Sequence, residues 1–71
     1  MKVESATIFA NGREEQIQLP CSVDKFVTAH GWKATQVVVE RNGKVLGREE
    51  LCNVMLQSGD QLEVIVPVAG G

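Results

Sequence analysis

The sequence predicts a two-layer α+β fold in which one helix covers a mixed sheet of four to five strands. Two Asn-Gly pairs, Asn11-Gly12 and Asn42-Gly43, each lie between apolar or alternating segments. This dipeptide is the strongest short-range signal for a β-hairpin. Helical spacing of apolar residues occurs in one segment, residues 22–31, and a last alternating segment, residues 61–66, ends at Pro67.

The bulk composition fits one small globular domain. The chain has 71 residues, of which 44% are hydrophobic and 23% charged, a balance that differs from disordered chains. We expect residues 1–67 to form the domain and residues 68–71 to be a flexible tail. A net charge of -2 with scattered Lys and Arg argues against nucleic acid as a partner. With no long apolar run and no secretory signal, we expect no membrane contact, a cytoplasmic location and a monomer when free.

The first half of the chain predicts a hairpin followed by a short helix. Ser5–Ala10 is the first strand and Glu15–Leu19 its return strand, with Ile17 and Leu19 facing inward. Ser22 is a suitable N-cap and Gly31 a suitable residue just past the helix end. The apolar stripe of this helix consists of Val23, Phe26, Val27 and His30.

The second half predicts more strands. Gln36–Arg41 is β-branched and apolar, so we expect a central strand that is buried largely on both faces. A short strand follows at Lys44–Leu46, and Gly47–Leu51 predicts an irregular or single-turn helical stretch. In the last strand, Gln61–Val66, we expect one face to be inward and the other to carry Glu63 and Ile65. The inward residues are Leu62, Val64 and Val66.

These elements predict a known architecture. The first and last strands can lie side by side and parallel in the centre, joined by a long crossover through the helix. This arrangement is the β-grasp, or ubiquitin-like, fold.

The two cysteines and the histidine predict no metal site. Cys21 and Cys52 form no C-x-x-C pair, and the single His30 cannot complete a zinc site. We expect both thiols to be free and to pack as small buried hydrophobes. The alternative for Cys21 is a reactive thiol, because a helix N-terminus lowers thiol pKa values.

Four stretches of the sequence resemble the ThiS family of sulfur carriers, within the wider ThiS/MoaD group. They cover most of the chain from about Thr7 onward, and their order and spacing make the set specific. The tail Pro67–Gly71 is also similar to the proline-containing tail of MoaD-like carriers. The four stretches are Ile8–Gly12, Asn42–Leu51, Ser58–Leu62 and Ala69–Gly71.

The resemblance implies a carrier role rather than catalysis. In such families a ThiF-like adenylating enzyme uses ATP and magnesium to activate the C-terminal carboxylate, here that of Gly71. Sulfur from a donor such as a cysteine desulfurase then gives a thiocarboxylate, which passes its sulfur to a ThiG-like thiazole synthase. The chain is thus expected to be a protein co-substrate that binds no cofactor of its own.

The tail suits entry into a partner's closed active site. Val68, Ala69, Gly70 and Gly71 span at most about 14 Å when extended, and the two glycines pass narrow channels because they lack a Cβ. The tail is uncharged before its terminal carboxylate.

The body of the domain is expected to dock separately from the tail. Phe9 and Ile65 are candidates for one apolar docking spot, if their strands are neighbours; the alternative is ordinary edge packing. Carboxylates expected at the surface are available to a basic partner, although such charges are often simply solvated. They are Glu40, Glu49, Glu50, Asp60 and Glu63.

Two other functions remain open at this point. The Pro67 tail favours a MoaD-like carrier subunit of molybdopterin synthase. A ubiquitin-like modifier that is conjugated to lysines through Gly71 would carry the same terminus.

Overall fold

The computed structural model describes residues 4–67, which contain five strands, one α-helix and two short 3₁₀ helices. In chain order these elements are β1 Ser5–Ala10, β2 Arg13–Gln18, α1 Val23–Ala29, η1 Ala34–Gln36, β3 Val38–Arg41, β4 Lys44–Val45, η2 Arg48–Glu50 and β5 Gln61–Ile65.

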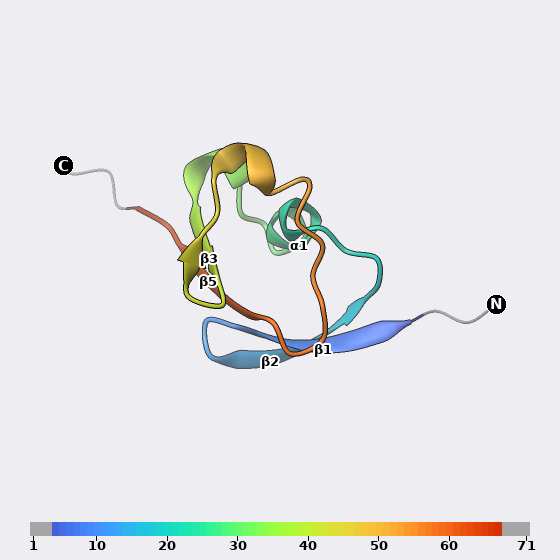
Figure 1. Ribbon diagram of the computed structural model, residues 1–71. Helices are drawn as coiled ribbons and strands as arrows, with labels where there is room; N and C mark the ends of the chain where they lie inside the picture. The colour runs from blue at the N-terminus through green and yellow to red at the C-terminus, as the bar shows by residue number, and fades with distance from the viewer. Residues whose placement is uncertain (1–3, 68–71) are drawn as a thin grey trace.

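The sheet has the predicted β-grasp topology. Its strand order is β2-β1-β5-β3-β4, so the last strand lies in the centre. β1 and β5 pair in parallel, whereas β1–β2, β3–β4 and β3–β5 are antiparallel. Figure 1 shows the sheet curving around α1, which covers one of its faces. The predicted two-layer α+β fold is therefore confirmed.

Both Asn-Gly pairs form the predicted tight turns. Asn11 and Gly12 have φ angles of 52° and 80°, and Asn42 and Gly43 have 53° and 85°. Positive φ at both central residues defines the type I′ turn, whose twist matches that of the flanking strands. The two hairpins β1–β2 and β3–β4 thus follow directly from local sequence.

The helix begins and ends where the sequence predicts. The Ser22 hydroxyl accepts a hydrogen bond from the Lys25 backbone N–H at 3.0 Å, and Gly31 past the helix end has a φ of 86°.

The His30 ring stacks against Trp32 with 5.6 Å between ring centroids, and its Nε2 lies 2.7 Å from a Glu15 oxygen. His30 is therefore a half-exposed packing residue that links α1 to β2.

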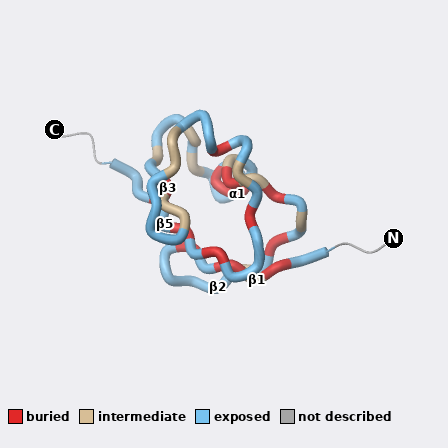
Figure 2. The backbone as a smooth tube through the Cα atoms, in the orientation of Figure 1, coloured by how far each residue is buried: buried red, intermediate tan, exposed pale blue. Residues whose placement is uncertain are grey.

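The core lies between α1 and the inner face of the sheet. Figure 2 shows the buried residues gathered on α1 and on the sides of the strands that face it. Aliphatic side chains dominate this core, and those that are essentially inaccessible to solvent come from β1, α1, β3 and β5. They are Ile8, Val23, Val27, Val39 and Leu62.

The prediction for β3 was wrong in two respects. The strand begins at Val38 rather than Gln36, which lies in η1, and it is not buried on both faces. Val39 is buried, but its neighbour Val38 is exposed. One helix covers only one face of the sheet, so the alternate residues of a β-branched strand remain on the open face.

The inward placement of Val66 was also wrong. Leu62 and Val64 are buried as expected, but β5 ends at Ile65 and Val66 is 53% exposed. The alternation of the sequence continues to Val66, whereas the core does not extend that far.

Asp60 is a buried carboxylate at the start of β5, although the sequence placed it among the surface charges. It accepts hydrogen bonds from the Gln57 backbone N–H at 2.8 Å, from Arg41 Nε at 3.0 Å and from Asn42 Nδ2 at 3.1 Å. Burial raises the pKa of Asp60, but these three donors and the Arg41 charge outweigh it, and the net pKa lies below the usual value. The carboxylate thereby ties β5 to the β3–β4 turn.

We expect the Asp60→Asn substitution to lower the unfolding free energy by about 2 kcal/mol at pH 7, since hydrogen bonds to a charged group are lost. The folded-state pKa of Asp60 is lowered, so its contribution is present above the unfolded-state pKa of about 3.9 and is lost as pH falls through the folded-state value. Urea unfolding of both proteins from pH 7 down to pH 2 measures this difference.

The control is Glu63→Gln, which neutralises an exposed carboxylate on the same strand. Its unfolding free energy should match that of the unmodified protein within about 0.5 kcal/mol. A gap between Asp60→Asn and the unmodified protein that stays constant down to pH 2 would show that the charge of Asp60 does not stabilise the fold.

Candidate functional site

β5 leads from the centre of the sheet into the segment that the sequence singles out for chemistry. It ends at Ile65, and Val66 and Pro67 continue it to residue 67, the last that the structure describes. The four predicted tail residues lie outside the described residues. They are Val68, Ala69, Gly70 and Gly71. The part of the site that the structure defines is therefore the C-terminal end of β5 with Val66 and Pro67, which we call the exit of β5, and its surroundings.

On the β3 side, backbone pairing accompanies β5 to its end. The antiparallel register runs from Arg41 opposite Leu62 to Val38 opposite Ile65. At the start of β5, the Asn42 backbone N–H donates to the Gln61 carbonyl at 2.7 Å, and the Gln61 N–H donates to Asn42 Oδ1 at 2.9 Å. This edge of β5 thus has partners along its whole length.

On the β1 side, backbone pairing stops early. Phe9 lies opposite Gln61 and Ala10 opposite Leu62, and the Asn11 N–H still donates to the Leu62 carbonyl at 2.9 Å. The chain then turns away at Gly12. The side chain of Asn11 continues the pairing, because its Oδ1 accepts from the Val64 N–H at 2.8 Å and its Nδ2 donates to the Val64 carbonyl at 3.4 Å.

Sequence analysis predicted no role for the side chains of Asn11 and Asn42 beyond their turns. The only available signal was that asparagine, rather than aspartate or glycine, stands at the first position of both turns. Asparagine alone among these three carries both a donor and an acceptor in its side chain.

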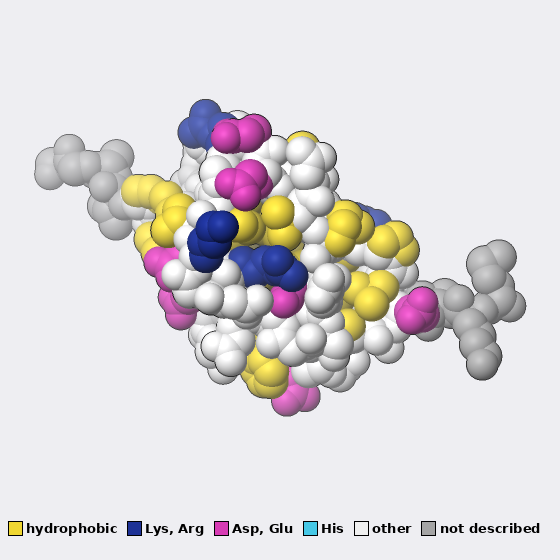
Figure 3. Space-filling model, viewed as in Figure 1, with side chains coloured by type: hydrophobic (Ala, Val, Ile, Leu, Met, Phe, Trp, Pro, Cys, Tyr) yellow, Lys and Arg dark blue, Asp and Glu magenta, His cyan; other side chains and the backbone are white. Residues whose placement is uncertain are grey.

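Exposed apolar side chains surround the exit of β5. We call this the exit patch and define it as Val38, Ile65 and Val66. Val38 and Ile65 are directly opposite in the register and both exposed, Ile65 at 43%. Figure 3 shows yellow side chains gathered where the described chain ends, beside magenta acidic groups.

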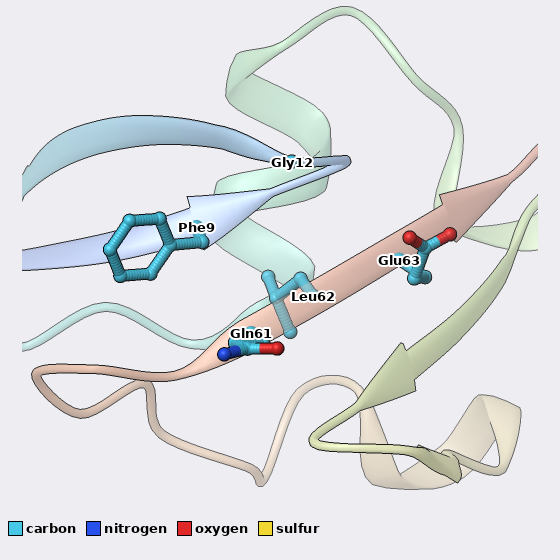
Figure 4. A pocket seen from close by; sticks show the side chains of 5 residues that line it. All are labelled: Phe9, Gly12, Gln61, Leu62 and Glu63. Atoms are coloured by element: carbon cyan, nitrogen blue, oxygen red, sulfur yellow. The ribbon is translucent and has the colours of Figure 1, made fainter.

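The sheet does not bring Phe9 and Ile65 into one spot. Both are exposed, but Phe9 lies opposite Gln61, four residues before Ile65, which corresponds to about 13 Å along the strand. Ile65 instead pairs with Val38, whose exposure the sequence did not predict. Phe9 instead lines a separate hollow of about 260 Å³. Figure 4 shows this hollow, where β1 turns at Gly12 and β5 continues through Glu63.

Acidic side chains accompany the apolar ones on the open face. Glu14 lies opposite Phe9, and Glu40 lies opposite Glu63. Like charges directly opposite on neighbouring strands are mildly destabilising. Neither Glu40 nor Glu63 forms an ion pair with the residues that the structure describes.

The two cysteines differ from each other. Cys21 is buried as predicted, and burial raises the pKa of its thiol although the Lys25 charge opposes the shift, so the thiolate is disfavoured. The prediction that Cys52 is buried was wrong. It is exposed in the turn after η2, because Leu51 takes the inward position there.

Residues 4–67 contain no group of three His, Cys, Asp or Glu side chains that could hold a metal ion. Over the same range, no helix is both long and apolar enough to cross a bilayer.

The fold defines a class of protein: a small β-grasp protein whose central strand, β5, is followed in the sequence by an uncharged segment that contains Gly70-Gly71. A sequence model of the ThiS family matches residues 6–71, and the chain belongs to that family. The class is one of small sulfur carriers rather than of catalysts. A search of curated proteins gave no match.

Two solved structures are similar to this chain. One is a crystal structure of the thiamine biosynthesis protein ThiS from Geobacter metallireducens, with 28% identity and a TM-score of 0.77 over 92% of this chain and 99% of that one. The other is a solution structure of a thiamine biosynthesis protein from the same organism, with 28% identity and a TM-score of 0.75 over 92% of this chain and 87% of that one.

We expect the exit patch to contribute little to stability. Ile65→Thr, which keeps a β-branched residue on the open face, should change the unfolding free energy by less than about 1 kcal/mol. The matched control on the adjacent buried position, Val64→Thr, should cost about 1–3 kcal/mol because it buries a hydroxyl. Urea unfolding measures both, and equal losses would mean that Ile65 is a packing residue.

Proposed function

We propose that this protein carries sulfur as a thiocarboxylate on Gly71 and donates it to form the thiazole of thiamine. The observation that carries the proposal is the position of β5. It lies in the centre of the sheet, has partners on both sides, and continues directly into an uncharged segment that ends in Gly70-Gly71. Membership of the ThiS family and the likeness to thiamine biosynthesis proteins support the pathway.

The terminal carboxylate requires activation before it accepts sulfur. In the proposed first step, a Gly71 carboxylate oxygen attacks the α-phosphorus of ATP in a ThiF-like adenylating enzyme, with magnesium present, and pyrophosphate leaves. The terminal sulfur of a persulfide, supplied through a cysteine desulfurase, then attacks the acyl carbon and AMP leaves. A partner thiol breaks the resulting S–S bond, which leaves a thiocarboxylate on Gly71 and a disulfide on the partner.

Docking and chemistry are separate in this proposal. The exit patch holds the body of the carrier outside the partner, while Val68 to Gly71 reach about 14 Å into it. Desolvation favours this division, because only the terminal carboxylate carries a charge within the inserted segment. A basic residue on the partner near Glu40 and Glu63 would relieve the repulsion between these cross-strand carboxylates.

The final acceptor in this proposal is a ThiG-like thiazole synthase. We place the chemistry in the cytoplasm, because the partner thiol that breaks the S–S bond stays reduced in a reducing compartment. Pro67 lies just before the tail and favours a second candidate function, that of a MoaD-like subunit of molybdopterin synthase. Reconstitution of sulfur transfer with each synthase separates the two candidates.

We expect intact mass spectrometry of the protein from its native host to show a fraction that is heavier by the difference between a sulfur and an oxygen atom. Fragmentation should place the substitution at Gly71. The comparison is the same protein from a strain lacking the adenylating enzyme, which should not contain the heavier fraction. An isopeptide bond from Gly71 to lysines of other proteins, with no thiocarboxylate, would favour a protein modifier instead.

Deletion of Gly70-Gly71 should abolish adenylation, because the reacting carboxylate no longer reaches the active site. The melting temperature should stay within about 2 °C, since the buried core residues of the described range all lie between Ala6 and Val64. Adenylation is measured as carrier-dependent exchange of pyrophosphate into ATP. The matched control is Ser58→Ala, an exposed turn substitution that should leave both measurements unchanged. A large fall in melting temperature on deletion would contradict the separation of tail and body.

A further inference from the structure

Asn11 holds β5 at the point where β1 has already turned away. Backbone pairing on this side ends at Leu62, and the Val64 N–H and carbonyl both bind the Asn11 side chain, at 2.8 Å and 3.4 Å. A carboxamide presents a donor and an acceptor side by side, as a peptide group does. Asn11 therefore acts as one more strand residue, although its own backbone belongs to the turn.

Among residues 4–67, no further backbone pairing supports this side of β5 beyond Val64. Alternate residues of a strand direct their backbone groups to the same side, so Val66 follows Val64. Val66 forms no backbone hydrogen bond within residues 4–67. The hollow lined by Gly12 and Glu63 marks the place where β1 leaves β5 (Figure 4). Asn11 is thus the last described contact on the β1 side before the exit.

The conformation of Asn11 explains why this residue type fits. Its φ of 52° lies in the left-handed region, which asparagine and glycine tolerate better than other residues. Glycine at this position would keep the turn but lose both contacts with Val64. Aspartate would still accept from the Val64 N–H but would have no donor for the carbonyl.

From these contacts we propose that Asn11 is a positioning residue for Gly71. Asn11 fixes the Val64 peptide groups. It thereby sets the direction in which β5 presents the tail, Val68 to Gly71, to the adenylating enzyme. This role rests on the proposed function. Without the contact, part of the β5 exit must be ordered again each time the carrier docks, which lowers the fraction of docked carriers with a correctly placed carboxylate.

Asn42 provides a matched control within the same chain. It has nearly the same φ, 53°, precedes a glycine in the same type of turn, and also bonds a β5 backbone N–H through its side chain. Its β5 partner is Gln61, at the opposite end of the strand from the exit. Asn11→Gly and Asn42→Gly both leave a turn-forming Gly-Gly pair and each remove two side-chain hydrogen bonds.

The first measurement is amide hydrogen exchange, which does not depend on the proposed function. In Asn11→Gly we expect the Val64 amide to exchange roughly ten-fold faster, which corresponds to 1.4 kcal/mol, about one net hydrogen bond. The amides of Glu63 and Ile65 face β3 and should change by less than about two-fold. Unchanged exchange at Val64 would overturn the proposal.

The second measurement separates kcat from KM in carrier-dependent pyrophosphate exchange with the adenylating enzyme. In Asn11→Gly we expect kcat to fall by roughly ten-fold while KM stays within about two-fold, because the exit patch still docks. Asn42→Gly should retain kcat within about two-fold at a comparable loss of stability. Asn11→Asp, which keeps the acceptor for the Val64 N–H, should recover most of the kcat.

The outcomes distinguish the two levels of the proposal. Equal kcat losses in Asn11→Gly and Asn42→Gly, or an unchanged kcat despite faster exchange at Val64, would make Asn11 a structural residue only and leave the carrier function intact. Absence of any pyrophosphate exchange with the unmodified protein would overturn the carrier function, and the positioning role with it.

Discussion

The rest of this structure depends on the hydrogen bonds that the central strand, β5, makes along both of its edges. β5 has only five residues, and it lies in the centre of the sheet between β1 and β3. β3 supplies one edge completely. The other edge depends on β1 for its first half and on the Asn11 carboxamide for Val64. Because unpaired buried peptide groups are costly, these contacts determine how far β5 remains part of the sheet.

A second constraint is that one helix of seven residues can cover only one face of a five-stranded sheet. The covered face holds the aliphatic core, and the other face remains in solvent. Apolar residues on that open face, such as Val38 and Ile65, are therefore exposed, which leaves them available for the docking that we propose. They lie beside the end of β5, so the proposed docking surface, the exit patch, is next to the segment that leads to the proposed reactive terminus.

The chemistry that we propose takes place at Gly71 in a partner's active site, which explains why the domain itself contributes few reactive groups. A carboxylate that another enzyme activates needs only to be delivered, without accompanying charges and in a defined direction. In our proposal, the described residues provide this delivery through β5, Asn11 and the exit patch. Burial raises the pKa of the Cys21 thiol and so disfavours its thiolate.

The sequence by itself determined the features that neighbouring residues control. The type I′ turns follow from Asn-Gly, the helix start from Ser22, and the inward face of β5 from the alternation at Leu62 and Val64. Each depends on backbone conformation within a few residues, and together they were enough to predict the β-grasp fold.

Tertiary structure alone decided the features that depend on which distant segments meet. It placed Asp60 against Arg41, exposed Val38 and Val66, and separated Phe9 from Ile65 through the register of β1 and β5. It also turned Asn11 from a turn former into a partner of Val64, 53 residues away. The physical reason is that strand register and the extent of the core are set by non-local pairing, which no local pattern in the sequence encodes.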